Sequence, residues 1–253
     1  MFPLRDENPT ELVPFFTFAL IAANVAVWFL VQGAGLEPGV LRQSVCEYGA
    51  IPAEITGQVD PLPAAFRSVR CPTGGLTWTA LVTSMFLHGG WFHLIGNMWF
   101  LWIFGNNIED SMGHLRFLLF YLLTGLAASG GHVLSEPGSQ IPTVGASGAI
   151  SGVMGAYLLL YPRVRVDTLL VIVFYIRVIP LPAWIMLGYW FLIQLLSGTT
   201  TAAASAGVAF WAHIGGFVAG LVLVKLFEKK ELVQAKKAHI RLDRRQIRHR
   251  GWW

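Results

Sequence analysis

The chain has 253 residues, of which 55% are hydrophobic and 13% charged, with a formal net charge of +4 and a mean hydropathy of +0.57. Soluble domains carry about 25% charged residues. The composition therefore excludes an ordinary water-soluble enzyme and indicates a polytopic membrane protein.

Long uncharged runs divide the chain into candidate membrane spans, each of which needs about 20 apolar residues. We expect an all-α, polytopic membrane protein built as a bundle of six transmembrane helices. In chain order the expected helices are Pro14–Val31, Phe86–Phe104, Phe117–Leu134, Ser147–Leu160, Leu181–Leu196 and Gly207–Leu226. A further, weaker uncharged run covers Thr168–Ile176.

The same pattern sets the domain organisation. We expect a short N-terminal segment (1–13), a six-helix domain (14–226) with a large loop at 32–77, and a basic tail (227–253). Six spans place both termini on one side, which then holds 15 of the 18 Lys and Arg residues. The positive-inside bias makes that side the cytoplasm, so we expect a multi-pass protein of a prokaryotic cell membrane with both termini cytoplasmic.

The loop at 32–77 contains both cysteines, Cys46 and Cys71. On this topology it lies outside the cytoplasm, where oxidising conditions favour a disulfide. Two unpaired thiols remain the alternative. The basic tail is expected to contact anionic lipid head groups rather than nucleic acid.

Polar residues inside spans are costly and tend to mark function. His93 with Asn97, Ser147 and His213 lie in the second, fourth and sixth expected spans. His93, Ser147 and His213 each precede a charged residue by 16 positions, or about 24 Å of helix. These side chains are therefore predicted to lie at a similar depth, which a shared site requires.

A serine hydroxyl becomes a nucleophile when an adjacent imidazole takes its proton. Ser147 and His213 fit these roles, because small residues around both would let the two helices approach closely. No acidic residue lies at that depth, so we expect a dyad without an orienting carboxylate. His93 and Asn97, one turn apart, could donate hydrogen bonds to an oxyanion. His88, Asn24 and Gln194 are read as structural.

Other interpretations of these residues exist. Small-residue repeats most often serve helix packing, and a transporter would also place polar groups near mid-membrane, although no inverted repeat is visible. The zincin motif His-Glu-x-x-His does not occur, and no pair of aspartates lies within the expected spans. We expect neither a metal nor a cofactor.

The chain resembles the rhomboid intramembrane serine proteases between about Thr77 and Leu226. The matching motifs are GASG at 145–148, AHIGG at 212–216, HGGWFHLIGN at 88–97, FLLFY at 117–121 and LPAW at 181–184.

The resemblance implies a six-helix core, with Ser147 as nucleophile, His213 as general base, and His93 and Asn97 in the oxyanion hole. It implies cleavage of single-span membrane proteins in or near their transmembrane helices. It also implies that the fifth helix and the loop Ser197–Gly207 act as gate and cap. A catalytically silent relative that only binds such helices is the competing hypothesis.

Two positions depart from the family pattern. Thr79 and Ala80 occupy the place of a Trp-Arg pair, and Ser151 occupies the place of a tyrosine that stacks on the catalytic histidine in some members. Orientation of His213 must therefore depend on other contacts. The sequence identifies neither the natural substrate nor the oligomeric state.

Overall fold

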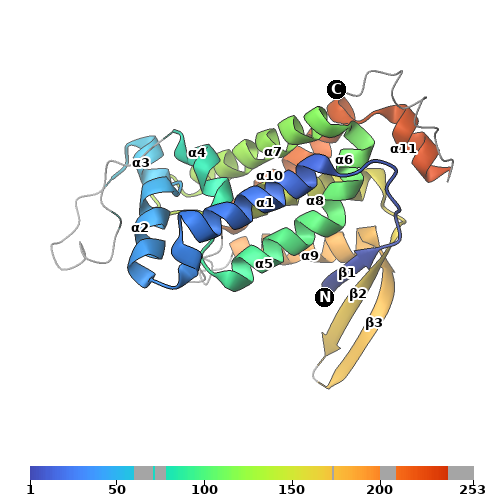
Figure 1. Cartoon of the computed structure of the whole chain (residues 1–253), viewed down its shortest axis with the longest axis horizontal. Helices are drawn as coiled ribbons and strands as arrows, with labels where there is room; N and C mark the ends of the chain where they lie inside the picture. Colours follow the sequence, from blue (N-terminus) through green and yellow to red (C-terminus); the bar gives the residue numbers. More distant parts are fainter. Residues whose placement is uncertain (60–70, 72–77, 173, 200–208, 239–253) are drawn as a thin grey trace.

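The computed structural model describes residues 1–59, 71, 78–172, 174–199 and 209–238. Its helices form an elongated bundle with a small sheet at one end (Figure 1). The long helices are α1 (Phe15–Leu30), α5 (Trp91–Phe100), α7 (His114–Ser135), α8 (Ser147–Leu160), α9 (Ala183–Gly198) and α10 (Phe210–Phe227).

Shorter elements lie at the two ends of the bundle. The end that holds the 32–77 loop carries η1 (Gly33–Gly35), α2 (Pro38–Tyr48), α3 (Pro52–Thr56), α4 (Ala80–Thr83) and η3 (Ser84–Phe86). Within this loop Cys46 is bonded to Cys71, with the Cα atoms 5.0 Å apart. The opposite end carries α6 (Asn106–Met112) and α11 (Lys230–Lys237).

Two helices of the described chain, α7 and α10, are long and apolar enough to cross a membrane by themselves, and α1, α8 and α9 are shorter apolar helices. The expected second helix, Phe86–Phe104, differs most from the structure. Gly89 and Gly90 delay its start to Trp91, and beyond Phe100 the chain makes one π-helical turn, η4 (Leu101–Gly105), before α6. The helix is thus continuous from Trp91 to Met112, with a π-helical segment in its middle, and it starts and ends later than expected.

Helix α8 is the centre of the bundle. Most of its residues are buried, and it packs between α7 and α10. Large side chains fully enclosed around it include Phe104, Tyr121 and Phe217. Because α8 is covered all round, its first residue is held in place from several sides.

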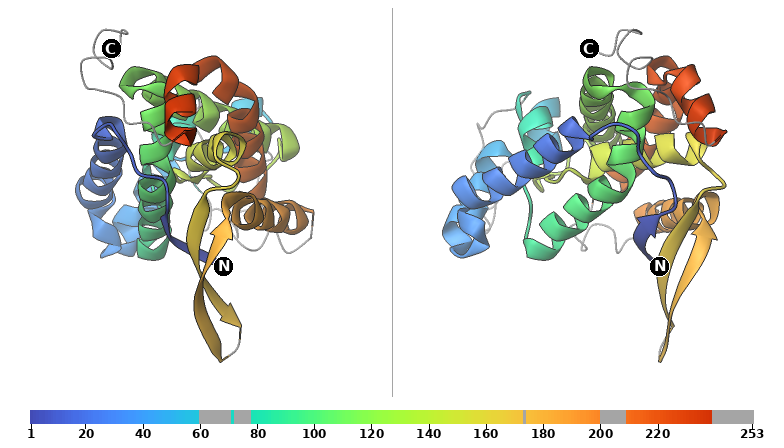
Figure 2. Two further views of the ribbon diagram at one scale, coloured as in Figure 1. Left: turned by 90° about the vertical axis from the view of Figure 1, so that its right-hand side faces the viewer. Right: turned by 45° about the vertical axis from the view of Figure 1, so that its right-hand side comes forward.

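The expectation of an all-α fold is wrong in one respect. Strands β1 (Phe2–Asp6), β2 (Arg165–Ile172) and β3 (Tyr175–Pro182) form an antiparallel sheet in the order β1-β2-β3. The weak uncharged run Thr168–Ile176 therefore belongs to a hairpin between α8 and α9. The N-terminal segment is its third strand, and Figure 2 shows the sheet extending away from the helices.

Buried carboxylates on α6 hold the N-terminal segment in place. Glu109 is fully buried and accepts hydrogen bonds from the backbone N–H groups of Phe16 and Thr17, at 2.9 and 2.8 Å. It thereby caps the N-terminus of α1, where a negative charge is favourable. Asp110 accepts the N–H of Leu12 and is paired with Lys236 of α11 at 2.8 Å.

A third carboxylate, Asp6 at the end of β1, reaches the same region. One of its oxygens accepts hydrogen bonds from Tyr157 Oη at 2.6 Å and from Asn107 Nδ2 at 2.7 Å. Burial raises the pKa of Asp6 to about 6, although the Tyr157 hydroxyl and the Lys236 ammonium act in the opposite direction. The ionised form is therefore disfavoured in the folded protein.

The raised pKa of Asp6 predicts the pH dependence of stability. An acid whose pKa is higher folded than unfolded favours folding below its unfolded pKa, and that contribution is lost as pH rises through about 6. Asp6→Asn keeps an acceptor oxygen without the charge. At pH 7.5 we expect Asp6→Asn to have a higher melting temperature than the wild type. Its free energy of unfolding should be larger by at most about 3 kcal/mol.

Thermal unfolding in detergent, followed by tryptophan fluorescence between pH 4 and 7.5, checks this. The difference in melting temperature between Asp6→Asn and the wild type should become smaller as the pH falls toward 4. Asp6→Ala, which loses the acceptor, should be destabilised at every pH. A melting-temperature difference between Asp6→Asn and the wild type that does not change with pH would contradict the raised pKa of Asp6.

Candidate active site

The structure brings Ser147 and His213 into direct contact. Ser147 is the first residue of α8 and His213 lies in the first turn of α10. The distance between Ser147 Oγ and His213 Nε2 is 2.7 Å, which is a good hydrogen bond. Two residues that lie 66 positions apart in the chain are therefore brought together.

The contact depends on glycines where α8 and α10 cross. A Cβ on Gly216 would overlap the carbonyl oxygen of Gly148, and a Cβ on Gly220 would overlap that of Gly152. Any side chain at these positions would push the helices apart. Because the helices leave no room for a Cβ at these glycines, the predicted close approach of two small-residue faces is confirmed.

The other ring nitrogen of His213 has a partner that the sequence reasoning missed. Gln194 Oε1 of α9 lies 2.7 Å from His213 Nδ1. An amide oxygen only accepts hydrogen bonds, so this contact requires the proton on Nδ1. Nε2 is then left with a lone pair toward the Ser147 hydroxyl. Gln194 therefore selects the tautomer that a general base needs.

A second α9 residue lies beside the imidazole. The Trp190 ring centroid is 5.7 Å from that of His213, with an angle of 38° between the ring planes. Ser151, at the position where some rhomboid proteases carry a stacking tyrosine, instead donates its hydroxyl to the carbonyl oxygen of Ser147 at 2.6 Å. The aromatic neighbour of the histidine thus comes from α9 rather than from α8.

His93 and Asn97 lie next to the serine through Gly145. A Cβ on Gly145 would be 2.7 Å from His93 Nε2 and 3.6 Å from Asn97 Nδ2, and its φ of +127° suits only glycine. The N–H of Gly89 donates to His93 Nδ1 at 3.3 Å, so neutral His93 carries its proton on Nε2. Among the described residues, Asn97 Nδ2 is buried without a hydrogen-bond partner. Two N–H donors therefore lie against Gly145, two residues before Ser147.

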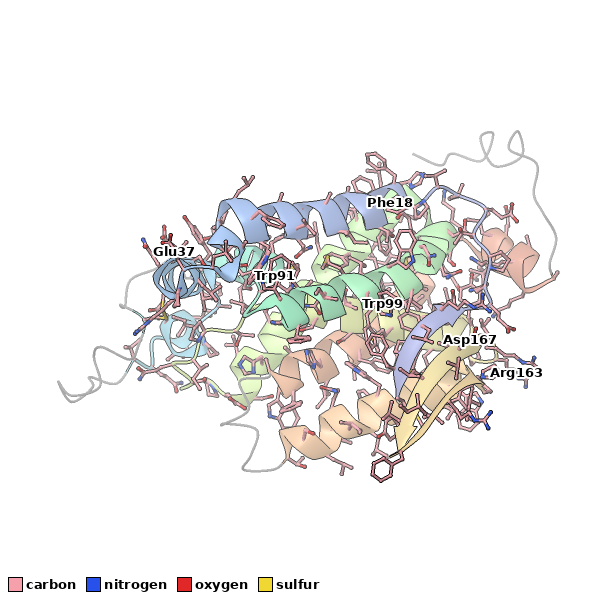
Figure 3. All side chains as sticks on the ribbon, turned by 60° about the horizontal axis from the view of Figure 1, so that its bottom comes forward. Phe18, Glu37, Trp91, Trp99, Arg163 and Asp167 are labelled. Carbon is pink, nitrogen blue, oxygen red and sulfur yellow. A yellow bond between two sulfur atoms is a disulfide. The ribbon has the colours of Figure 1, made fainter. Side chains whose placement is uncertain are left out.

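Ser147, His213, His93, Asn97 and Trp190 line one cavity of about 700 Å³, together with residues of α5, α7, α8 and α10. Its lining is mostly apolar and includes Trp91, Phe92 and Phe100 of α5. Figure 3 shows Trp91 at the end of the bundle that also carries Glu37. Most of the expected cap, Ser197–Gly207, lies outside the described residues.

In the part of the chain that the structure describes, no group of three or more His, Cys, Asp or Glu side chains could hold a metal ion. The polar side chains that line the cavity carry hydroxyls, two imidazoles and the amide of Asn97. This set suits acyl transfer, in which a nucleophile, a base and hydrogen-bond donors are sufficient.

Comparison with known proteins agrees with the motifs. Rhomboid-like protein 11, chloroplastic, of Arabidopsis thaliana is 34% identical over 157 residues, covering 60% of this chain and 53% of its own. Rhomboid protease GluP of Bacillus subtilis (strain 168) is 32% identical over 145 residues, covering 57% and 24%. Putative rhomboid protease YdcA of the same organism is 40% identical over 81 residues, covering 32% and 40%.

These matches span about half or less of the relatives' own length. The family profile described as "Rhomboid domain" matches residues 75–230, a range that contains the cavity's Ser147, His213, His93 and Asn97 as well as Gln194. With a polytopic helical membrane fold and this profile match over more than half of its length, the chain belongs to the rhomboid family.

Proposed function

We propose that the protein is an intramembrane serine endopeptidase that cleaves single-span membrane proteins with a Ser147–His213 dyad. The observation that carries the proposal is the continuous hydrogen-bonded chain from Ser147 Oγ through both nitrogens of His213 to Gln194 Oε1, with each step 2.7 Å long. A packing histidine needs only one such partner. A base needs one nitrogen fixed and the other aimed at the nucleophile.

In this mechanism His213 Nε2 takes the proton of Ser147 Oγ as the oxygen attacks the scissile carbonyl carbon. The carbonyl oxygen becomes an oxyanion, which His93 Nε2–H and Asn97 Nδ2–H are placed to stabilise. The backbone N–H of Ser147 is a third donor, because the first N–H groups of a helix have no partner within it. Protonated His213 then gives its proton to the leaving amine, and water hydrolyses the acyl-enzyme by the same route.

The proposed topology has six crossings, made by α1, the α5–η4–α6 unit, α7, α8, α9 and α10. Strand β1 and helix α11 lie at the same end of the bundle (Figure 1), as an even number of crossings requires. The concentration of Lys and Arg at that end makes it the cytoplasmic side of a cell membrane. The dyad then lies nearer the opposite surface, from which water must arrive.

The proposed substrates are membrane proteins with one transmembrane helix. The apolar walls between α5 and α9 suit a hydrophobic segment, and two relatives carry the name rhomboid protease. Small side chains near the cut are expected from the family resemblance. The mechanism assigns no step to a cofactor.

Removal of the nucleophile gives the first test. Fluorophosphonates form adducts with activated serines, so wild type should be labelled and Ser147→Ala should not. Ser151→Ala is the matched control, because its hydroxyl is engaged with the Ser147 carbonyl and its loss should leave labelling intact. His213→Ala should abolish cleavage of a model transmembrane substrate in vesicles. Labelling of Ser147→Ala, or cleavage by it, would refute the proposal.

Removal of one proposed oxyanion donor should lower the activity without abolishing it. Asn97→Ala should lower kcat by about 10²-fold while leaving measurable activity, because His93 and the Ser147 N–H remain. KM should change little, since the donor acts mainly in the transition state. Steady-state kinetics in vesicles measure both constants. Unchanged kcat in a folded Asn97→Ala protein would remove Asn97 from the oxyanion hole.

Gln194 is proposed as a positioning residue for His213, and substitution separates this role from simple packing. Gln194→Met preserves the side-chain length but removes the acceptor, so we expect kcat to fall by about 10²-fold with KM and melting temperature near wild type. Gln194→Glu retains an acceptor oxygen and should recover activity relative to Gln194→Met. Equal activity of Gln194→Met and wild type would contradict the positioning role.

A further inference from the structure

The hairpin of β2 and β3 has an outer half that the described protein leaves uncovered. Its root is held by the bundle, since Val166 and Thr168 are fully buried and β1 pairs with β2 as far as Leu169. Beyond that residue the two strands continue together without the third. In Figures 1 and 2 this part extends sideways from the bundle.

Side chains on one face of the outer hairpin are apolar and exposed. Antiparallel register pairs Leu169 with Val178 and Val171 with Ile176, so these four side chains share a face. Val171, Ile176 and Val178 are 59%, 63% and 52% exposed. Phe174 at the turn is 97% exposed. A contiguous apolar surface of this kind marks an interaction site.

The opposite face of the outer hairpin is also mostly apolar. It carries Leu170 and Ile179, both half-buried. Its one charged residue is Arg177, opposite Leu170, and an arginine can extend its charge away from an apolar surface. A solvated hairpin has one polar face and one apolar face. With both faces apolar, this one needs an environment that covers both.

Aromatic and basic residues place the root of the hairpin at the level of a membrane surface. Trp184, directly after β3, is 56% exposed, and Trp99 of α5 donates its indole N–H to Pro3 of β1 at 2.7 Å. Tryptophans gather at membrane–water interfaces. Arg163 and Arg165 are exposed at the start of the hairpin. Figure 3 shows Trp99, Arg163 and Asp167 at the same end of the bundle.

We propose that the outer half of this hairpin, residues 169–172 and 174–179, inserts into the interfacial region of the adjacent leaflet and that this leaflet is anionic. Because the segment beyond Leu169 extends sideways from the bundle, for roughly 10–15 Å at about 3.3 Å per residue, it stays near the level of its root, in the head-group and upper acyl region. Arg163 and Arg165 at its base complement anionic head groups. On the proposed topology this is the cytoplasmic leaflet.

Lipid fits the two-sided surface better than a protein partner does. A partner that docks on one face would leave the other face in water, whereas acyl chains and head groups surround both. The backbone also limits the depth. The outer edge of β3 is unpaired in the sheet, and an open edge cannot lie in the hydrocarbon core. Pro180 and Pro182 remove two N–H groups from that strand, which suits the wet interface.

A single fluorophore at the turn tests the proposal. Both native cysteines are in the disulfide, so Phe174→Cys provides one free thiol for an NBD label under non-reducing conditions, at a site whose exposure protects folding. Lys237→Cys on α11 is the matched control, because it is exposed at the same end of the bundle. The full chain is reconstituted in phosphatidylcholine vesicles with and without 30% phosphatidylglycerol, a proportion of roughly physiological order.

The label at position 174 should emit at shorter wavelength than the label at position 237. Lipids spin-labelled near the head group should quench it several-fold more. Iodide in the water should quench it less. Phosphatidylglycerol should increase the lipid quenching. Equal iodide access at both positions would overturn insertion. Blue-shifted emission that lipid spin labels do not quench, and that disappears on dilution into more lipid, would assign the surface to a second copy. Quenching that is insensitive to phosphatidylglycerol would overturn the anionic preference.

Discussion

The close crossing of α8 and α10 is the constraint on which the site depends. The backbones of α8 and α10 are in direct contact where Gly216 and Gly220 face the carbonyl groups of Gly148 and Gly152. In a membrane, helices gain little from apolar burial, so such close packing is a main source of association. The crossing sets the distance between Ser147 and His213. Larger residues at the crossing would separate the proposed nucleophile from the proposed base without touching either.

Orientation of the base comes from a different helix. Gln194 and Trp190 both lie on α9 and both contact the His213 ring, while α9 also forms one wall of the cavity. The α9 position therefore influences how well the base is oriented as well as how wide the cavity is. Helix α9 begins directly after the hairpin, so the proposed membrane contact lies next to the helix that holds the histidine.

Sequence reasoning located the proposed catalytic residues but missed part of their surroundings. Ser147, His213, His93 and Asn97 were found because polar groups at equal depth are rare in apolar helices. Gln194 was read as structural because its partner depends on how α9 is rotated, which spacing does not reveal. The sheet was missed because residues 169–179 are apolar at almost every position, which hides the alternation that normally identifies a strand. The later start of the second helix followed from Gly89 and Gly90, and its π-helical segment is a local conformation that composition does not reveal.

An experimental structure of the fluorophosphonate adduct, solved in lipid, tests the central claim most directly. The account predicts phosphorus bonded to Ser147 Oγ, the phosphonyl oxygen within about 3 Å of His93 Nε2 and Asn97 Nδ2, and His213 Nδ1 still bonded to Gln194. An adduct on another serine would contradict the assignment of the nucleophile. A phosphonyl oxygen directed away from both donors would contradict the oxyanion hole.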